Sequence, residues 1–182
     1  MKNIALAFLI FAPIISFSQD FSKQEIQSIE KVLKRSVSVI REFNAKSLVN
    51  GTSLISVELT GNPEIEGYVE NALFRSGFEV VTNQIALDVV KGSKPNSNEN
   101  EPSDKPAYNS VYLVKVSGQY FKGAFSGKCQ KALSSFSARI VDLADNGKLV
   151  GTFQFAENTM TYVACGEDIG NAFSYKLLEA VR

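Results

Sequence analysis

Two alternating stretches joined by an Asn-Gly turn constrain the fold more than any other feature of the sequence. Residues 134–144 and 148–156 alternate apolar and polar side chains, and Asp145-Asn146-Gly147 lies between them. Asn and Gly accept the positive φ values that a tight hairpin turn needs. The sequence therefore predicts an antiparallel β-hairpin in the C-terminal half, with Asp145 directly opposite Lys148.

Other periodic segments predict the remaining elements. The first helix should begin with the capping box Ser22 to Glu25, and the second with the cap Asn62 and the first-turn Pro63. Residues 83–90 fit both an alternating strand and one helical face, so both alternatives remain open. We expect helices at 23–44, 63–76 and 169–181, and further strands at 54–59, 78–81 and 111–120.

These elements together predict an α/β (α+β) domain. Strands interspersed with amphipathic helices are typical of a sheet packed under a helical layer. We expect a mixed, mostly antiparallel sheet of four to six strands flanked by helices.

The N-terminal residues 1–18 have the pattern of a secretory signal peptide. Lys2 is followed by an apolar run at 4–15, which is shorter than the roughly 20 residues of a membrane-spanning helix. Small residues precede a cut after Ser18, and the next residue is Gln19 rather than a lipid-accepting Cys. We therefore expect a bacterial periplasmic or secreted protein, with no transmembrane span in the mature chain. The alternative is a buried N-terminal strand or helix.

Residues 92–109 interrupt the pattern. They contain three Pro and four Asn, and no aliphatic side chain larger than Ala. Such a segment buries too little surface to offset the entropy of ordering. We expect a mobile loop within a single domain, residues 19–182; the alternative is an arm that binds a partner.

The two cysteines can be placed by counting along the predicted hairpin. With Asp145 opposite Lys148, Cys129 falls within one residue of the position opposite Cys165. A bulge or a slightly longer turn would align them. In an oxidising compartment we therefore expect a Cys129–Cys165 disulfide, with two buried thiols as the alternative.

Composition excludes several functions. The chain has no His, which removes His-based catalytic triads and His-ligated zinc. Its 19 basic and 19 acidic residues balance, which is unlike a nucleic-acid binder. Residues 123–129 resemble a phosphate-binding loop but are one residue short, and Asp142 to Gly147 lacks the ligand order of a calcium loop. We expect no enzyme activity, cofactor or metal.

Three aromatic residues lie among glycines at the end of a predicted strand. Tyr120, Phe121 and Phe125 are flanked by Gly118, Gly123 and Gly127. Exposed aromatic side chains on flexible backbone are typical of recognition surfaces. They are the candidate partner-binding residues; the alternative is that they cover the edge of the core.

Several short motifs follow one another in a distinctive order. They are a helix ending in Gly77-Phe78-Glu79-Val80-Val81, then Tyr112-Leu113-Val114 up to Gly118, then Val141-Asp142 with Gly147 and Val150. This order resembles a group of periplasmic domains: the curli-secretion lipoprotein, flagellar outer-membrane accessory lipoproteins and activators of penicillin-binding proteins. The chain departs from the group in lacking the lipid-bearing Cys and in carrying a cysteine pair.

This resemblance implies a domain that binds or assembles with other proteins and performs no chemistry. We therefore expect a non-enzymatic envelope protein whose partner is another envelope protein. Contact would use the aromatic residues, the 92–109 loop or a sheet edge. The alternative is a small-ligand carrier or a His-independent hydrolase of the cell envelope.

Overall fold

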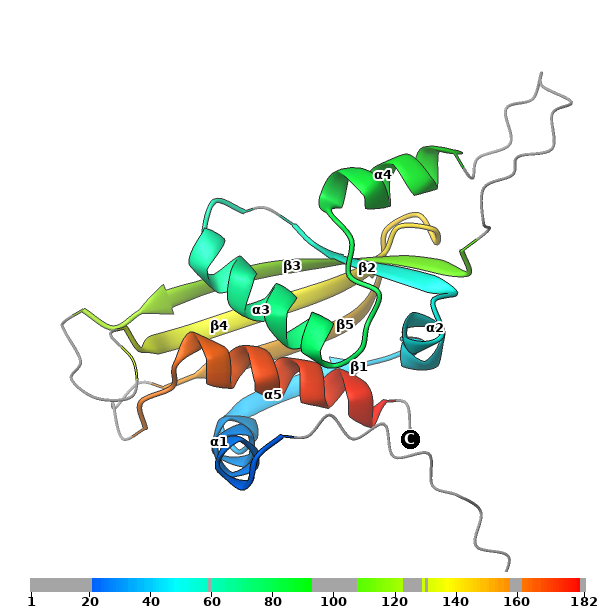
Figure 1. Cartoon of the computed structure of the whole chain (residues 1–182). Helices are drawn as coiled ribbons and strands as arrows, with labels where there is room; N and C mark the ends of the chain where they lie inside the picture. The colour runs from blue at the N-terminus through cyan, green and yellow to red at the C-terminus, as the bar shows by residue number, and fades with distance from the viewer. Residues whose placement is uncertain are drawn as a thin grey trace, which may run out of the picture.

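Figure 1 shows the computed structural model of the chain. The structure describes residues 21–58, 60–92, 108–122, 129, 131–157 and 162–180. The predicted signal peptide, nearly all of the predicted loop at 92–109, and Phe125 lie outside the described residues.

The fold is α+β, built on a five-stranded mixed sheet, as predicted. Its strand order is β1-β5-β4-β3-β2; β2 and β3 are parallel, and the other neighbours are antiparallel. β1 and β2, which are consecutive along the chain, therefore lie at opposite edges. The strands are β1 (Ser36–Ile40), β2 (Ser53–Val57), β3 (Ser110–Tyr120), β4 (Leu133–Asp142) and β5 (Lys148–Ala156).

Three helices cover one face of the sheet. α5 (Gly166–Glu179) lies between α1 (Lys23–Leu33) and α3 (Pro63–Arg75), and packs against both (Figure 1). The short α2 (Ala45–Val49) connects β1 to β2. This layer closes the main core.

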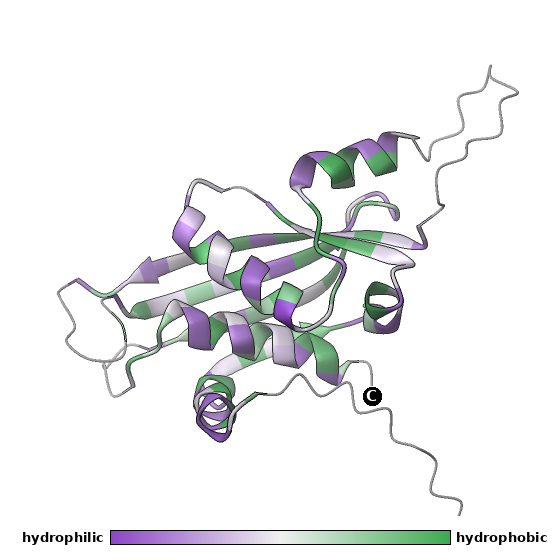
Figure 2. Cartoon of the chain, viewed as in Figure 1, coloured by the Kyte–Doolittle hydropathy of each residue, from purple (hydrophilic) through white to green (hydrophobic). Residues whose placement is uncertain are grey.

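α4 (Asn83–Gly92) lies on the other face, at the β2–β3 end. Its Ala86 packs with Leu54 and Val111, whereas the next strand residues, Ile55 and Tyr112, belong to the main core. Successive side chains of a strand point to opposite faces, so the two clusters lie on opposite sides of the sheet. The alternation of hydropathy along the strands is visible in Figure 2.

Aromatic packing joins α5 to the centre of the sheet. Phe173 of α5 has its ring centroid 5.7 Å from that of Phe153 and 6.3 Å from that of Phe136. All three side chains are almost fully buried. Tilted and edge-on contacts of this kind add to the stabilisation from burial alone.

The predicted helix boundaries are confirmed where local caps define them. The Ser22 side chain accepts from the Glu25 N–H while the Glu25 carboxylate accepts from the Ser22 N–H. Asn62 caps α3, and Gly77 follows it with φ of +76°. These caps depend only on neighbouring residues.

The predicted helix at 23–44 is wrong beyond Leu33. The chain turns at Lys34 and Arg35, and Ser36–Ile40 forms β1 against β5. Val37, which fitted the helical spacing, is 69% exposed. Ser-Val-Ser-Val also alternates, and pairing with β5 selects the strand.

The structure corrects the predicted strand at 78–81 and decides between the two alternatives for residues 83–90. Phe78 to Val81 forms only an isolated parallel bridge, in which Ile55 N–H donates to the Glu79 carbonyl and Val81 N–H to the Ile55 carbonyl. The ambiguous residues 83–90 are helical and form most of α4.

The hairpin is present, but its turn is longer than predicted. Asp142, not Asp145, lies opposite Lys148. The Asp142 carboxylate accepts from the Ala144 N–H and its carbonyl from the Gly147 N–H, which closes a five-residue turn. Asn146 and Gly147 both have the expected positive φ, at +54° and +75°.

Candidate binding surface

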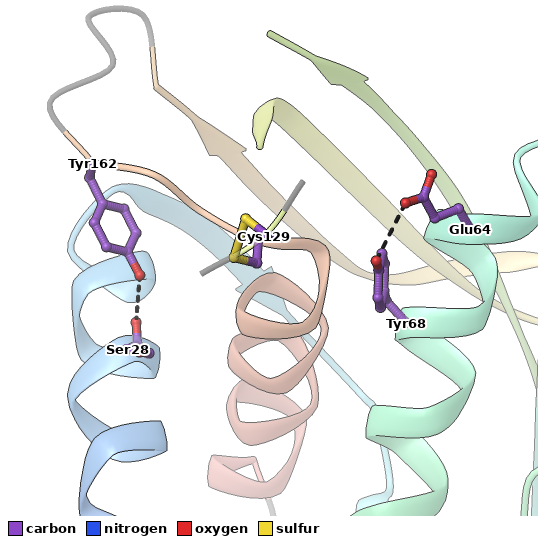
Figure 3. The surroundings of a disulfide bond; sticks show 6 residues. Ser28, Glu64, Tyr68, Cys129 and Tyr162 are labelled. Carbon is purple, nitrogen blue, oxygen red and sulfur yellow. Dashed lines mark hydrogen bonds between the residues drawn. A yellow bond between two sulfur atoms is a disulfide. The ribbon is translucent and has the colours of Figure 1, made fainter. Parts of the chain in front are cut away.

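The predicted disulfide is present. Cys129 and Cys165 are bonded, with 5.8 Å between their Cα atoms. They are not a cross-strand pair as the counting implied: Cys129 lies ahead of β4, and Cys165 is the residue that precedes α5 (Figure 3). The bridge therefore fastens the start of α5 to the end of the sheet.

Tyr120 is packed rather than freely exposed. It ends β3, is half-buried, and has the Lys131 ammonium 5.5 Å from its ring centroid. Lys131 Nζ also lies 3.1 Å from Glu64 Oε2, and the Tyr68 hydroxyl donates to Glu64 Oε1 (Figure 3). Burial, and then the charge of Glu64, raises the pKa of Tyr120.

The other predicted aromatic residues are placed only in part. Phe121 follows β3, is half-buried, and its N–H donates to the Ala132 carbonyl. Phe125 lies outside the described residues. The location of Tyr120 agrees with the core-edge alternative, and a binding role for these residues stays a prediction.

The face of the sheet opposite α1, α3 and α5 is largely polar, and the described residues leave most of it uncovered. α4 covers it only near β2 and the start of β3. The Glu58 carboxylate lies on this side, paired with Lys115. We name the open face a set of neutral and basic side chains on the same side, which come from four neighbouring strands. They are Val37, Val39, Lys115, Ser117, Gln119, Ser135, Ser137, Arg139, Thr152 and Gln154.

A shallow depression of about 360 Å³ lies on the open face. Register brings its hydroxyl and amide groups together, since Ser117 pairs with Ser137 and Ser137 with Gln154. Side-chain hydroxyl and amide groups both donate and accept hydrogen bonds. Five such residues line it: Ser117, Gln119, Ser135, Ser137 and Gln154.

The open face ends at the unpaired edge of β1. The Arg41 N–H donates to the Val150 carbonyl, and the same register continues along β1 and β5. In an antiparallel pair, every second residue directs its N–H and C=O to the neighbour. Val37 and Val39 therefore bond to β5, while Ser36, Ser38 and Ile40 direct their backbone groups outward.

Within the described residues, no backbone or side-chain group bonds to these outward groups of β1. The opposite edge of the sheet is different, because Glu79 and Val81 bond to β2 through Ile55. β1 also exposes Val37 and Val39, at 69% and 47% of their surface. Natural sheets usually protect an edge of this kind.

Charged side chains lie near both ends of β1, and the acidic ones are paired: Glu42 with Lys148, and Glu157 with Arg35. Arg35 Nε lies 3.0 Å from Glu157 Oε2, and Lys115 Nζ lies 3.0 Å from Glu58 Oε1. Arg41 and Arg139 have no ion-pair or hydrogen-bond partner for their side chains among the described residues. An acidic group would neutralise them.

The described residues form no cluster of side chains suited to catalysis or metal binding. No cluster of three His, Cys, Asp or Glu side chains able to hold a metal occurs among them. Ser117, Ser135 and Ser137 make no described bond to a carboxylate. Among the same residues, no helix is long and apolar enough to cross a membrane.

Comparison with known proteins adds little. No protein-family model matches the chain, and no curated protein matches it. Among solved structures, a minor lipoprotein from Acinetobacter baumannii is similar over 70% of this chain and 93% of that chain, with 11% identity and a TM-score of 0.33. Similarity this weak supports no transfer of function.

Sequence reasoning missed the β1 edge. It named a sheet edge as one possible contact surface, but it placed residues 36–40 in a helix. The strict Ser-Val-Ser-Val alternation was the signal that could have identified the strand.

Proposed function

We propose that this chain is an exported protein that acts by binding another protein and catalyses no reaction. The supporting observation is the open face together with the unpaired β1 edge beside it. The main core forms without this surface, and among the described residues only α4 packs on part of the same face. Soluble domains seldom leave an apolar sheet edge unprotected unless it has a partner.

Two observations support export. The first 18 residues have the pattern of a signal peptide. Cys129 and Cys165 form a disulfide, and structural disulfides persist mainly in oxidising compartments such as the bacterial periplasm. We therefore propose that the partner is a protein of the cell envelope.

Site-specific photo-crosslinking in the native cell tests this function. A photoreactive phenylalanine analogue replaces Gln154 on the open face or, as a matched control, Glu30 on the exposed side of α1. We expect a discrete protein adduct from position 154 and none from position 30. The proposal is overturned if the open face gives no adduct, or if the purified protein hydrolyses an envelope sugar or peptide.

A small-ligand carrier is the second candidate, because the depression on the open face has the groups to bind a neutral polar molecule. A thermal-shift screen against sugars and peptidoglycan fragments tests it. A ligand at 100 times its Kd stabilises the folded protein by about 2.7 kcal/mol. A hit that disappears in Ser137→Leu would favour the carrier over the protein-binding function.

A further inference from the structure

We infer that the outer edge of β1 receives an extended, acid-flanked segment of a partner protein as a sixth strand of the sheet. The inference rests on the proposed function, protein binding, and specifies the surface and the chemistry of the partner. Its observations are the backbone pattern of β1, the side chains on its exposed face, and the charges at its two ends.

The backbone of β1 presents a regular row of hydrogen-bonding groups. Ser36, Ser38 and Ile40 direct their N–H and C=O away from β5, because Arg41 and the alternate residues before it bond inward. An incoming antiparallel strand would bond to these three residues in turn. Strand addition of this kind draws its affinity mainly from main-chain bonds.

The side chains of β1 favour a β-branched partner. Val37 and Val39 lie on the open face and are 69% and 47% exposed. Residues that bond inward occupy non-hydrogen-bonded positions toward a new strand, where facing side chains approach most closely. Two β-branched side chains of the incoming segment would therefore cover these valines.

Charge selects the flanks of the partner segment. Lys34 lies exposed before β1 and Arg41 directly follows it, and neither side chain has a partner among the described residues. The nearby Glu42 is already paired with Lys148. A segment with an acidic residue at each end would complement both cations.

A second copy of this chain fits the edge less well. Antiparallel self-pairing centred on Ser38 would place Arg35 opposite Arg41 of the other copy. Directly opposed like charges destabilise a strand pair. Pairing along only five residues would also bury less surface than a stable dimer needs, which is on the order of 1,000 Å².

Two capped peptides test the inference by fluorescence anisotropy. The first is Glu-Thr-Val-Thr-Val-Thr-Thr-Glu, which places its two Glu residues opposite Arg41 and Lys34, and the second has Lys in place of both Glu. We expect the unmodified protein to bind the acidic peptide at least tenfold more tightly. We expect Arg41→Glu to weaken that binding at least tenfold and to remove the preference for the acidic peptide.

Ser38→Pro tests the backbone contribution. The N–H of Ser38 points away from β5, so proline at this position removes an outward donor without removing a bond within the sheet. We expect tenfold weaker peptide binding with an unchanged thermal midpoint. Asn71→Ala, at an exposed position of α3, is the control and should bind like the unmodified protein.

Equal binding of both peptides, or unchanged binding in Arg41→Glu, would overturn the inference. So would a dimer of this chain that Ser38→Pro dissociates, because the occupant would then be a second copy.

Failure of the inference can be distinguished from failure of the proposed function. Cross-links from position 154 that persist in Ser38→Pro would overturn the edge inference alone, whereas peptide binding without any cellular cross-link would overturn the proposed function alone.

Discussion

Glu25 shows how a single carboxylate connects two helices. It closes the capping box of α1 and accepts from Arg75 Nη2 of α3 at 2.8 Å. The hydrogen bond from Arg75, and next the Ser22 N–H, lower the pKa of Glu25 from 4.5 to about 2. The ionised form is therefore the one that the folded state favours.

Stability should depend on the ionisation of Glu25. Because the pKa is lowered on folding, the contribution is present above pH 4.5 and is lost as the pH falls toward 2. Glu25→Gln keeps a capping side chain but removes the charge. We expect a loss of about 1 kcal/mol at pH 6, after allowance for solvent screening, and almost none at pH 2. Urea unfolding at both pH values measures it; a loss independent of pH would contradict the assignment.

The disulfide should contribute more than any single surface contact. Its cysteines are 36 residues apart, and cross-linking a loop of this length stabilises by about 4 kcal/mol in the chain-entropy model. We expect the double variant Cys129→Ser, Cys165→Ser to lose up to that amount in urea unfolding. Reductant should lower the stability of the unmodified protein equally and leave the variant unchanged. A reductant effect on the variant would show that another process was being measured.

At the scale of elements, α3 and α5 approach each other at a position that requires glycine. A Cβ at Gly170 of α5 would lie 2.6 Å from the Tyr68 carbonyl oxygen of α3. Gly67, one residue before Tyr68, has open space around it. The two positions therefore separate close helix packing from the general effect of glycine in a helix.

We expect Gly170→Ala to destabilise the protein by about 1–3 kcal/mol, because the two helices must separate. Gly67→Ala should be neutral or stabilise by up to about 1 kcal/mol, because alanine is the better helix former. Thermal or urea unfolding of the two variants gives the comparison. Equal effects of the two substitutions would mean that α3 and α5 do not pack at Gly170.

For the whole molecule, strand order sets which parts open most easily. β4 lies at the centre of the sheet with neighbours on both sides, whereas β1 has one neighbour and a free outer edge among the described residues. Local opening costs least where few interactions must break. The proposed binding edge is therefore also the least protected strand.

Hydrogen exchange should show this arrangement directly. We expect the slowest amide exchange in β4, and alternating exchange in β1. The amides of Val37 and Val39 should be protected by β5, and those of Ser36, Ser38 and Ile40 should exchange rapidly. Residue-resolved NMR exchange measures this pattern. Uniform protection along β1 would mean that its outer edge is already covered within the protein.

Local sequence determined the features that depend on near neighbours. The capping box at Ser22, the cap at Asn62, the left-handed Gly77 and the positive φ of Asn146 and Gly147 were all predictable, because each needs only a few adjacent residues. Amphipathic spacing likewise indicated α3, α5 and the sheet class.

Only the tertiary structure decided the identity of residues 36–40, the register of the hairpin and the position of the candidate site. Ser36–Ile40 satisfies both periodicities locally, and pairing with β5, more than a hundred residues later, selects the strand. Asp142 sets the turn by hydrogen bonds that the Asn-Gly pair does not specify. A free edge is a property of the assembled sheet, because it depends on which strands find no second neighbour.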